Sequence, residues 1–251
     1  MKRILLIDAD ILVYTVASAQ EVPTEWDEDV WTLHSDFAAA RLDFSHRVSE
    51  LVYTLKADDV IMALTTKERN FRKDILPTYK HNRKKVRKPL VWGALREYCT
   101  ESFVTFIRDG LEGDDCLGIL ATRTADKNVE KIVVSIDKDL QTIPGTHYNQ
   151  GKPELGIYEV SVPMADRFHM MQTLMGDTTD GYGGCPGVGP KTAEKILDAA
   201  KEGEWKAVVD AYAKAGFGEE YALAQARCAR ILRASDYDFK NKKPILWEPT
   251  K

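Results

Sequence analysis

The residues between Gly176 and Ala193 are of types that suit chemistry on phosphate. Asp177 and Asp180 place two carboxylates three residues apart, shortly before the glycine-rich stretch Gly184–Gly189. Carboxylate oxygens favour hard divalent cations such as Mg²⁺ or Mn²⁺. The glycine-rich stretch opens a predicted helix, whose N-terminal N–H groups and dipole stabilise a phosphate. Metal ligands beside a phosphate-binding turn favour an enzyme that acts on nucleic acid.

A P-loop is the first alternative for this turn, because Gly184 and Gly189 have the P-loop spacing. However, Pro190 separates Gly189 from Lys191, and no strand is predicted before the turn. These two features exclude an NTPase of the P-loop class. A plain tight turn before a helix stays open as the other reading.

More carboxylates follow predicted strands. Short apolar runs rich in β-branched residues predict buried strands at Ile4–Ile7, Val60–Leu64, Phe103–Ile107 and Ile132–Ile136. The acids that follow these runs are Asp8, Asp10, Glu112, Asp114, Asp115, Asp137 and Asp139. Ligands of open α/β sheets bind beyond the carboxyl ends of the strands. We therefore expect these acids to share one pocket with Asp177 and Asp180.

Such a cluster of acids needs cations, because carboxylates a few ångströms apart repel one another. Two divalent ions are the usual solution at sites of phosphoryl transfer. Each member also has a simpler reading on its own. Asp8-Ala9-Asp10 could be a strand-end turn, Glu112 to Asp115 a helix cap, and Asp137-Lys138-Asp139 a solvated turn. The metal site is predicted from the joint pattern rather than from any one member.

Between the predicted strands lie helical patterns, at residues 37–55 with Ser35 or Asp36 as N-cap and at Asp114–Arg123. This alternation predicts an α/β fold with a mainly parallel central sheet. Beyond residue 162 the patterns are helical, at Pro163–Met175, Trp205–Ala215 and Glu219–Arg233. We expect an α/β core over residues 1–162, a helical lobe over 163–235 and a trailing segment over 236–251.

Composition narrows the class of protein. Hydrophobic residues make up 44% of the 251 residues, which supports a folded core. No apolar run reaches the length of a membrane span, and the apolar run after Arg3 is too short for a signal peptide. The four cysteines form no Cys-x-x-Cys pair, so a zinc ribbon is not expected. We expect a cytoplasmic protein without membrane contacts.

Charge is concentrated in one stretch of the chain. The net charge is −4, but the segment from Lys67 to Lys88 holds ten Lys or Arg and two acids, or +8. We call residues 67–88 the basic segment. A cationic stretch on an acidic body predicts a phosphate-binding surface, with a solvated helix face or loop as the alternative.

Together, these residues resemble the 5′-nuclease superfamily of flap endonucleases and 5′–3′ exonucleases, most of all the exonucleases of T7-type bacteriophages. The resemblance rests on Ile7-Asp8, Phe71-Arg72, Glu112-Gly113-Asp114-Asp115, Asp137-Lys138-Asp139, Gly176-Asp177 with Asp180, and Gly184–Ala193. It implies a PIN-like fold with a helical arch at residues 67–100 and a helix–turn–helix element that grips duplex DNA. One departure is a Thr, Thr66, where many members have an Asp after the second strand.

The resemblance also assigns roles to residues. It implies a first metal held by Asp8, Glu112 and Asp114, and a second held or oriented by Asp115, Asp137, Asp139, Asp177 and Asp180. Lys80 and Arg83 would stabilise charge on the scissile phosphate. The DNA-binding set would be Arg72, Lys80, Arg83, Lys84, Lys85, Gly187, Gly189, Lys191 and Thr192. A K⁺ ion at the glycine turn is implied as well. Trp92 and Tyr98 could stack on a single strand, although core packing is the favoured reading for Trp92.

These observations predict a Mg²⁺- or Mn²⁺-dependent nuclease that acts on 5′ ends or flaps of double-stranded DNA. The resemblance further implies RNase H-like removal of RNA primers from RNA–DNA hybrids, and contacts with replication proteins, in an infected bacterium. Because Thr66 carries no charge, a structure-specific DNA-binding protein with weak or no catalysis is the alternative. A small-molecule phosphohydrolase is a third reading, but it leaves the basic segment and the glycine turn unexplained.

Overall fold

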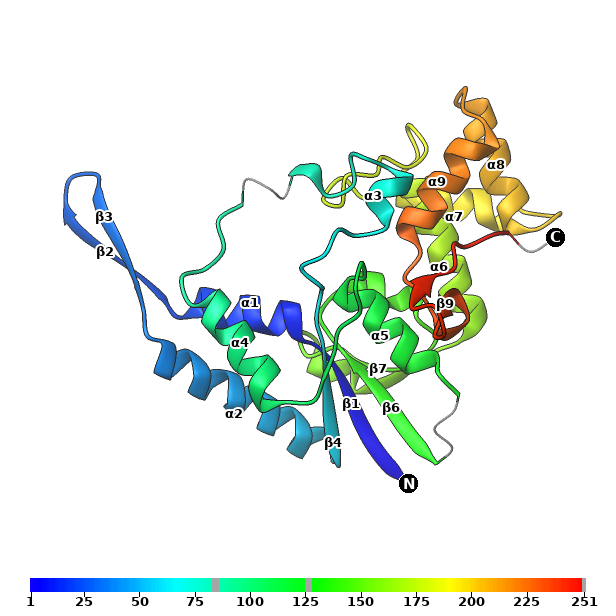
Figure 1. Ribbon diagram of the computed structural model, residues 1–251. Helices are drawn as coiled ribbons and strands as arrows, with labels where there is room; N and C mark the ends of the chain where they lie inside the picture. Colours follow the sequence, from blue (N-terminus) through cyan, green and yellow to red (C-terminus); the bar gives the residue numbers. More distant parts are fainter. Residues whose placement is uncertain (83–85, 125–127, 250–251) are drawn as a thin grey trace.

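The structure is a computed structural model that describes residues 1–82, 86–124 and 128–249 (Figure 1). Its centre is a six-stranded sheet in the order β5-β4-β1-β6-β7-β8, and the neighbours from β5 to β7 pair in parallel while β8 pairs antiparallel. The strands are β1 (Lys2–Asp8), β4 (Asp59–Ala63), β5 (Thr105–Phe106), β6 (Val129–Val134), β7 (Gly145–Tyr148) and β8 (Ile157–Val160). The expected α/β class with a mainly parallel sheet is confirmed.

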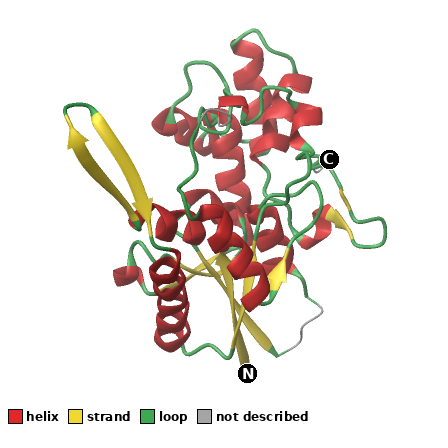
Figure 2. Cartoon of the chain, turned by 60° about the vertical axis from the view of Figure 1, so that its left-hand side comes forward, coloured by secondary structure: helices red, strands yellow, loops and turns green. Residues whose placement is uncertain are grey.

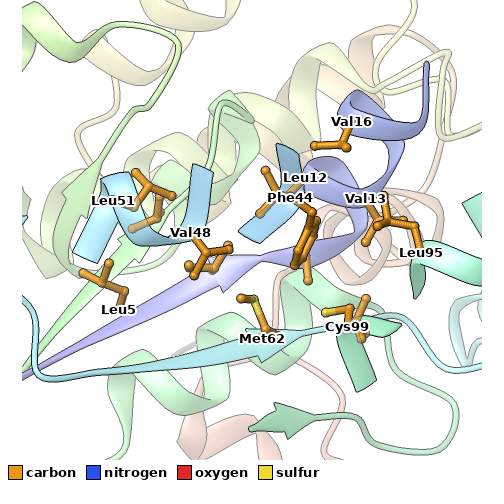
Figure 3. Packing of buried hydrophobic residues seen from close by; sticks show 14 of the residues in the cluster. Leu5, Leu12, Val13, Val16, Phe44, Val48, Leu51, Met62, Leu95 and Cys99 are labelled. Carbon is orange, nitrogen blue, oxygen red and sulfur yellow. The ribbon is translucent and has the colours of Figure 1, made fainter. Parts of the chain in front are cut away.

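Helices cover both faces of the sheet because alternate strand residues point to opposite sides. On one side, α1 (Ala9–Ala19), α2 (Phe37–Leu55) and α4 (Trp92–Ser102) pack against Leu5 and Ile7 of β1 (Figure 3). On the other side, α5 (Gly113–Thr122) packs against Leu6 of β1. Since both faces are apolar, the strands read as continuous apolar runs, and this is why the sequence reveals them.

The C-terminal lobe contains α6 (Val162–Met175), α7 (Pro190–Asp198), α8 (Glu204–Lys214) and α9 (Glu219–Ala229) around a core of its own. Pro190 occupies the first turn of α7, where its missing N–H is not needed. Helix α9 ends four residues before the predicted Arg233. The chain then becomes extended, so that Ile231 and Leu232 pack under the sheet with α5.

Residues 236–249 do not trail from the body as expected. Strands β9 (Tyr237–Asp238) and β10 (Lys243–Pro244) form a short hairpin, and Tyr237 is buried beside α5. Trp247 then packs edge-on against His169 of α6 and Trp205 of α8. Aromatic contacts of this kind hold the C-terminal segment on the lobe. No helix among the described residues is long and apolar enough to cross a lipid bilayer.

A feature missed in the sequence is the hairpin of β2 (Glu21–Asp27) and β3 (Val30–Ser35). It projects from the body, away from the C-terminal lobe, in both views (Figures 1 and 2). Its side chains are largely exposed, including Trp26 and Trp31. Two strands without a covered face give no clear alternation of apolar and polar residues, which explains the miss.

The described part of the basic segment contains little regular helix. Helix α3 spans four residues, Arg72–Ile75, and the next helix that the structure describes, α4, begins at Trp92. Residues 86–89 have no regular secondary structure, and Arg83, Lys84 and Lys85 lie outside the described residues. Within residues 67–82 and 86–88, α-helix is thus limited to α3, and the helical arch over residues 67–100 stays a prediction. Pro89 and the run of like charges around it explain why helix is disfavoured there.

Candidate active site

The carboxyl ends of the parallel strands carry the predicted acids. Strand β1 ends at Asp8, which caps α1, and Glu112 caps α5 after β5. Strand β6 is followed by Asp137, which caps the 3-10 helix Lys138–Thr142. Parallel pairing brings these strand ends to one edge of the sheet. A carboxylate in the loop between a strand and the next helix can cap that helix. The same positions therefore serve both folding and chemistry.

Asp8 and Asp114 are neighbouring acids of this edge that raise each other's cost of ionisation. Asp8 is 2% exposed and accepts hydrogen bonds from Ser135 Oγ at 2.8 Å and from the Ile11 backbone N–H at 3.2 Å. Burial raises the pKa of Asp8 to about 7, and the charges of Asp10 and Asp137 add to the rise. Burial and the neighbouring Asp8 also raise the pKa of Asp114 well above its usual value. Without a cation, these two groups cannot both ionise easily.

Glu112 is a carboxylate of this edge that neighbouring cationic side chains neutralise. Lys80 Nζ lies 2.7 Å from Glu112 Oε1, and the Tyr79 hydroxyl donates to Oε2 at 2.9 Å. Burial opposes ionisation of Glu112, but Lys80 and Arg72 outweigh it and hold its pKa at about 2. Lys80 Nζ also lies 3.3 Å from Asp180 Oδ2. Lys80 therefore joins an acid of the α/β core to an acid of the C-terminal lobe.

Asp139 belongs to a second acidic group that spans the sheet edge and the lobe. Burial raises the pKa of Asp139 to about 6, with further increases from Asp137, Asp177 and Asp180. Its Oδ1 is buried, and no atom of the described residues hydrogen-bonds it. A buried carboxylate oxygen without a donor is costly in free energy. A bound cation would remove this cost, so the position fits a metal ligand.

The loop with Asp177 and Asp180 is positioned by a close crossing of glycines. Gly176 and Gly184 both have positive φ, and a Cβ on Gly184 would lie 2.3 Å from the Gly176 nitrogen. Cys185 N–H donates to Leu174 O at 2.8 Å beside this crossing. Asp177 then accepts from the Thr179 and Asp180 N–H groups, which fixes the turn. The glycines let the loop return against the end of α6 and reach the sheet edge.

Taken together, the acids form two overlapping groups rather than a finished metal site. Mutual electrostatic effects link Asp8, Glu112, Asp114 and Asp137 in one group and Asp137, Asp139, Asp177 and Asp180 in the other. No three His, Cys, Asp or Glu side chains among the described residues are arranged to hold one ion as they stand. The oxygen ligands and the unsatisfied Asp139 fit hard divalent ions. Binding of divalent ions to these acids requires side chains to shift, including that of Lys80.

Asp115 and Arg72 have a different place from the predicted one. Arg72 donates from both terminal nitrogens to Asp115 at 2.7 Å, and the two side chains are 2% and 0% exposed. Asp115 also accepts the N–H groups of Leu232 and Glu112. Four donors fill the acceptor positions of this carboxylate. The prediction that Asp115 binds metal and the prediction that Arg72 binds DNA are corrected: the pair joins α3, α5 and the extended segment after α9.

At the glycine turn, the predicted DNA-binding residues are at the surface. Gly187, Gly189, Lys191 and Thr192 are all exposed around the N-terminus of α7. Gly187 has a φ of +75°, which a residue with a side chain rarely adopts. Gly189 is the N-cap residue and its carbonyl accepts from Thr192 and Ala193. This helix end is open to an anion, as a phosphate contact requires.

A cavity of about 890 Å³ adjoins Glu112 and Lys80. Its other lining residues are Asp10, Ile11, Tyr14, Thr15, Thr65, Thr66, Lys67, Lys73, Lys88, Trp92, Arg96 and Ile136. Trp92 packs partly on the core, as the favoured reading predicts, but also borders this cavity. Five cationic side chains beside the two aromatic rings of Tyr14 and Trp92 suit a nucleotide chain.

Sequence reasoning missed several polar residues in this region. Arg96 donates to Asp10 Oδ1 at 2.6 Å, and the Thr65 N–H donates to Asp10 Oδ2 at 2.6 Å. Tyr79 was missed as well, although its hydroxyl contacts both Glu112 and Asp180. These residues come from helix α4 and from loops, and their positions in the sequence have no regular spacing from those of the acids. Two of them had a signal in the sequence, because Tyr79 precedes Lys80 and Thr65 lies two residues after β4.

The raised pKa values of Asp8 and Asp139, about 7 and about 6, predict a pH-dependent effect of metal on stability. In the metal-free protein these acids stabilise the fold below their unfolded pKa, and that stability is lost as pH rises through 6 to 7. Divalent cations bind the ionised forms. We expect the increase in Tm produced by Mg²⁺ to be larger at pH 8 than at pH 5.5, measured by calorimetry. An equal increase at both values would contradict this site.

Comparisons with known proteins agree with this geometry. The family of 5′–3′ exonuclease N-terminal, resolvase-like domains matches residues 3–159. The exonuclease of Escherichia phage T7 is 32% identical, over 99% of this chain and 94% of its own length. The exodeoxyribonuclease of Enterobacteria phage T3 is 31% identical, over 99% and 93%. The flap endonuclease Xni of Shewanella baltica is 29% identical over 78% of this chain and 74% of its own length.

Solved structures share the fold at low identity. The protein of bacteriophage T5 that was co-crystallised with metal ions has a TM-score of 0.63 and 16% identity, covering 90% of this chain and 88% of its own. A T5 flap endonuclease in complex with DNA and metal ions has a TM-score of 0.62 at the same identity and the same coverage of both chains. The sheet with its C-terminal helical lobe is thus a known arrangement.

Proposed function

The chain belongs to the 5′–3′ exonuclease family and is a 5′ nuclease, and we propose that acids at its sheet edge bind two divalent cations for hydrolysis. The ligands of the first ion are Asp8, Glu112 and Asp114, and those of the second are Asp137, Asp139, Asp177 and Asp180. The observation that carries this proposal is the buried Asp139 Oδ1, which has no donor among the described residues. Mg²⁺ or Mn²⁺ fits these hard oxygen ligands.

When bound, such ions activate a water molecule for in-line attack and stabilise the leaving oxygen. Lys80 is held between Glu112 and Asp180 in the metal-free protein. With cations on the acids, its ammonium group would turn to the non-bridging oxygens of the phosphate. There it stabilises the negative charge that develops in the transition state. Arg83 has the same role in the proposal, although it lies outside the described residues.

DNA binds in the proposal across two surfaces. The N-terminus of α7, with Gly187, Gly189, Lys191 and Thr192, contacts the duplex backbone, and a K⁺ ion can join this contact. Lys84 and Lys85 of the basic segment contact the single strand at a 5′ end or flap. The relatives include an exodeoxyribonuclease and flap endonucleases. We extend the proposal to RNA–DNA hybrids, to replication proteins as partners, and to the cytoplasm of an infected bacterium.

A cleavage assay tests this proposal. Purified protein is mixed with a duplex that carries a 5′ flap and a label at the flap end, in Mg²⁺ and separately in EDTA. We expect cleavage with Mg²⁺ and none with EDTA, because the acids alone cannot activate water. Binding without cleavage in Mg²⁺ would instead favour a structure-specific DNA-binding protein, the alternative that Thr66 suggests. Turnover of a nucleotide monophosphate without DNA cleavage would support a small-molecule phosphohydrolase.

A further inference from the structure

The first residue of the projecting hairpin holds the basic segment. Both terminal nitrogens of Arg87 donate to the Glu21 carboxylate, each at 2.7 Å. The Leu90 backbone N–H donates to Glu21 Oε1 at 2.8 Å. One carboxylate therefore fixes the chain on both sides of Lys88. The hydrogen bonds from Arg87 and Leu90 lower the pKa of Glu21 to about 2, so it stays ionised at neutral pH.

The residues held in this way border the cavity beside the acidic site. Lys88 Nζ lies 3.4 Å from the centre of the Trp92 ring, and Arg87 also donates to the Lys88 carbonyl at 3.0 Å. Lys88 and Trp92 line the same cavity as Lys80 and Glu112. An ammonium group over an indole face is a favourable pair, and both groups can contact a nucleotide.

Residues 80–82 of the basic segment are held independently of Glu21. Lys80 N–H donates to the Asp180 carbonyl at 2.7 Å, and Asn82 Nδ2 donates to the Thr178 carbonyl at 3.1 Å. These contacts attach residues 80–82 to the loop with the lobe acids. Loss of Glu21 would thus release residues 87–90 while Lys80 keeps its place at the acidic site.

An ordinary surface ion pair is the competing explanation, since exposed pairs contribute little to stability. Two observations oppose it. The Glu21 side chain is only 13% exposed, whereas that of Arg87 is 56% exposed. The carboxylate also binds a backbone N–H, which an incidental pair does not need.

We infer that Glu21 is a positioning residue, which holds Lys88 and Trp92 where they bind the 5′ single strand of the DNA substrate. This inference rests on the proposed nuclease function. Glu21 does not touch the DNA in this account. It acts through Arg87 and the backbone of Leu90, from its place at the base of the exposed hairpin.

Glu21→Gln and Glu25→Gln test the inference as a matched pair. Glu25 lies on the same strand and is exposed. Both changes remove one negative charge, which alone would leave DNA binding unchanged or slightly tighter. We expect Glu25→Gln to behave so. We expect Glu21→Gln to weaken binding of a 5′-flap duplex about fivefold in EDTA, the lower end of what one stacked base contributes. Binding of nicked duplex without a flap should not change.

Kinetics and stability complete the test. With the flap substrate in Mg²⁺, Glu21→Gln should raise KM about as much as it weakens binding, with kcat and Tm nearly unchanged. In an Arg87→Gln background, Glu21→Gln should have a clearly smaller effect, because the contact is already broken. The inference is overturned if Glu21→Gln binds flap DNA as Glu25→Gln does, or if flap and nicked duplex weaken equally. If the wild-type protein itself fails to cleave the flap, the proposed function fails instead.

Discussion

Replacing Asp139 by Asn is expected to lower kcat at least about 100-fold while leaving most DNA binding intact. The amide keeps the shape of the side chain but removes the charge that the second cation needs. Asp139 is half-buried, and its Oδ1 has no donor among residues 1–82, 86–124 and 128–249. The variant should fold normally, because the raised pKa of about 6 shows that the charged form is disfavoured without metal.

Single-turnover cleavage of a labelled flap and binding of the same flap in EDTA measure the two effects. Asp59→Asn is the matched control, since Asp59 starts β4 at the opposite edge of the sheet and is half-exposed beside Lys2. Its activity should equal that of the wild type. Turnover by Asp139→Asn within a few-fold of the wild type would remove Asp139 from the metal site.

Replacing Arg72 by Met is expected to destabilise the protein by about 3–5 kcal/mol, the usual cost of breaking a buried ion pair. The change leaves the carboxylate of Asp115 fully buried without its partner. It also removes donors from the carbonyls of Cys228 and Arg230, which lie at the end of α9. Arg72 therefore stabilises the fold and does not bind DNA in this account.

Urea unfolding measures this free energy, and Arg72→Met with Asp115→Leu is the control. The double variant should recover much of the loss, because replacing both partners by apolar groups removes the unpaired charge. Calorimetric titration with Mn²⁺ adds a second readout: Asp115→Asn should keep the metal affinity of the wild type. A loss below 1 kcal/mol for Arg72→Met, or loss of Mn²⁺ binding for Asp115→Asn, would restore Asp115 to the metal site.

The elements that could be predicted from the sequence are those that a single local effect determines, such as the burial of a strand or the capping of a helix. The C-terminal halves of strands β1, β4 and β6 are the buried parts, and there the sequence is a short apolar run that ends where polar residues begin. Asp36 caps α2 with its side chain, as its position before the periodic pattern indicates. The acids followed from the same reasoning, because parallel strands bring their carboxyl ends together.

Other features depend on tertiary contacts that a sequence does not display. Asp114 and Asp115 are adjacent acids of one motif, yet Asp114 faces the acidic edge and Asp115 faces Arg72. Only the rotation of α5 separates their roles. The C-terminal segment was expected to trail, but Trp247 holds it through contacts with the rings of His169 and Trp205, which are far away in the chain. Nothing in the sequence of the basic segment indicates that Arg87 pairs with Glu21, which lies 66 residues earlier.

The central claim is that acids from separate strands meet around divalent ions beside a cationic segment. A crystal soaked with Mn²⁺ and a short 5′-overhang duplex, with anomalous scattering recorded, tests it directly. We predict two Mn²⁺ peaks, one against Asp8, Glu112 and Asp114 and one against Asp139 and the loop of Asp177 and Asp180, with Lys80 turned to a phosphate. Peaks elsewhere, or an acidic edge that stays empty while DNA is bound, would contradict the account.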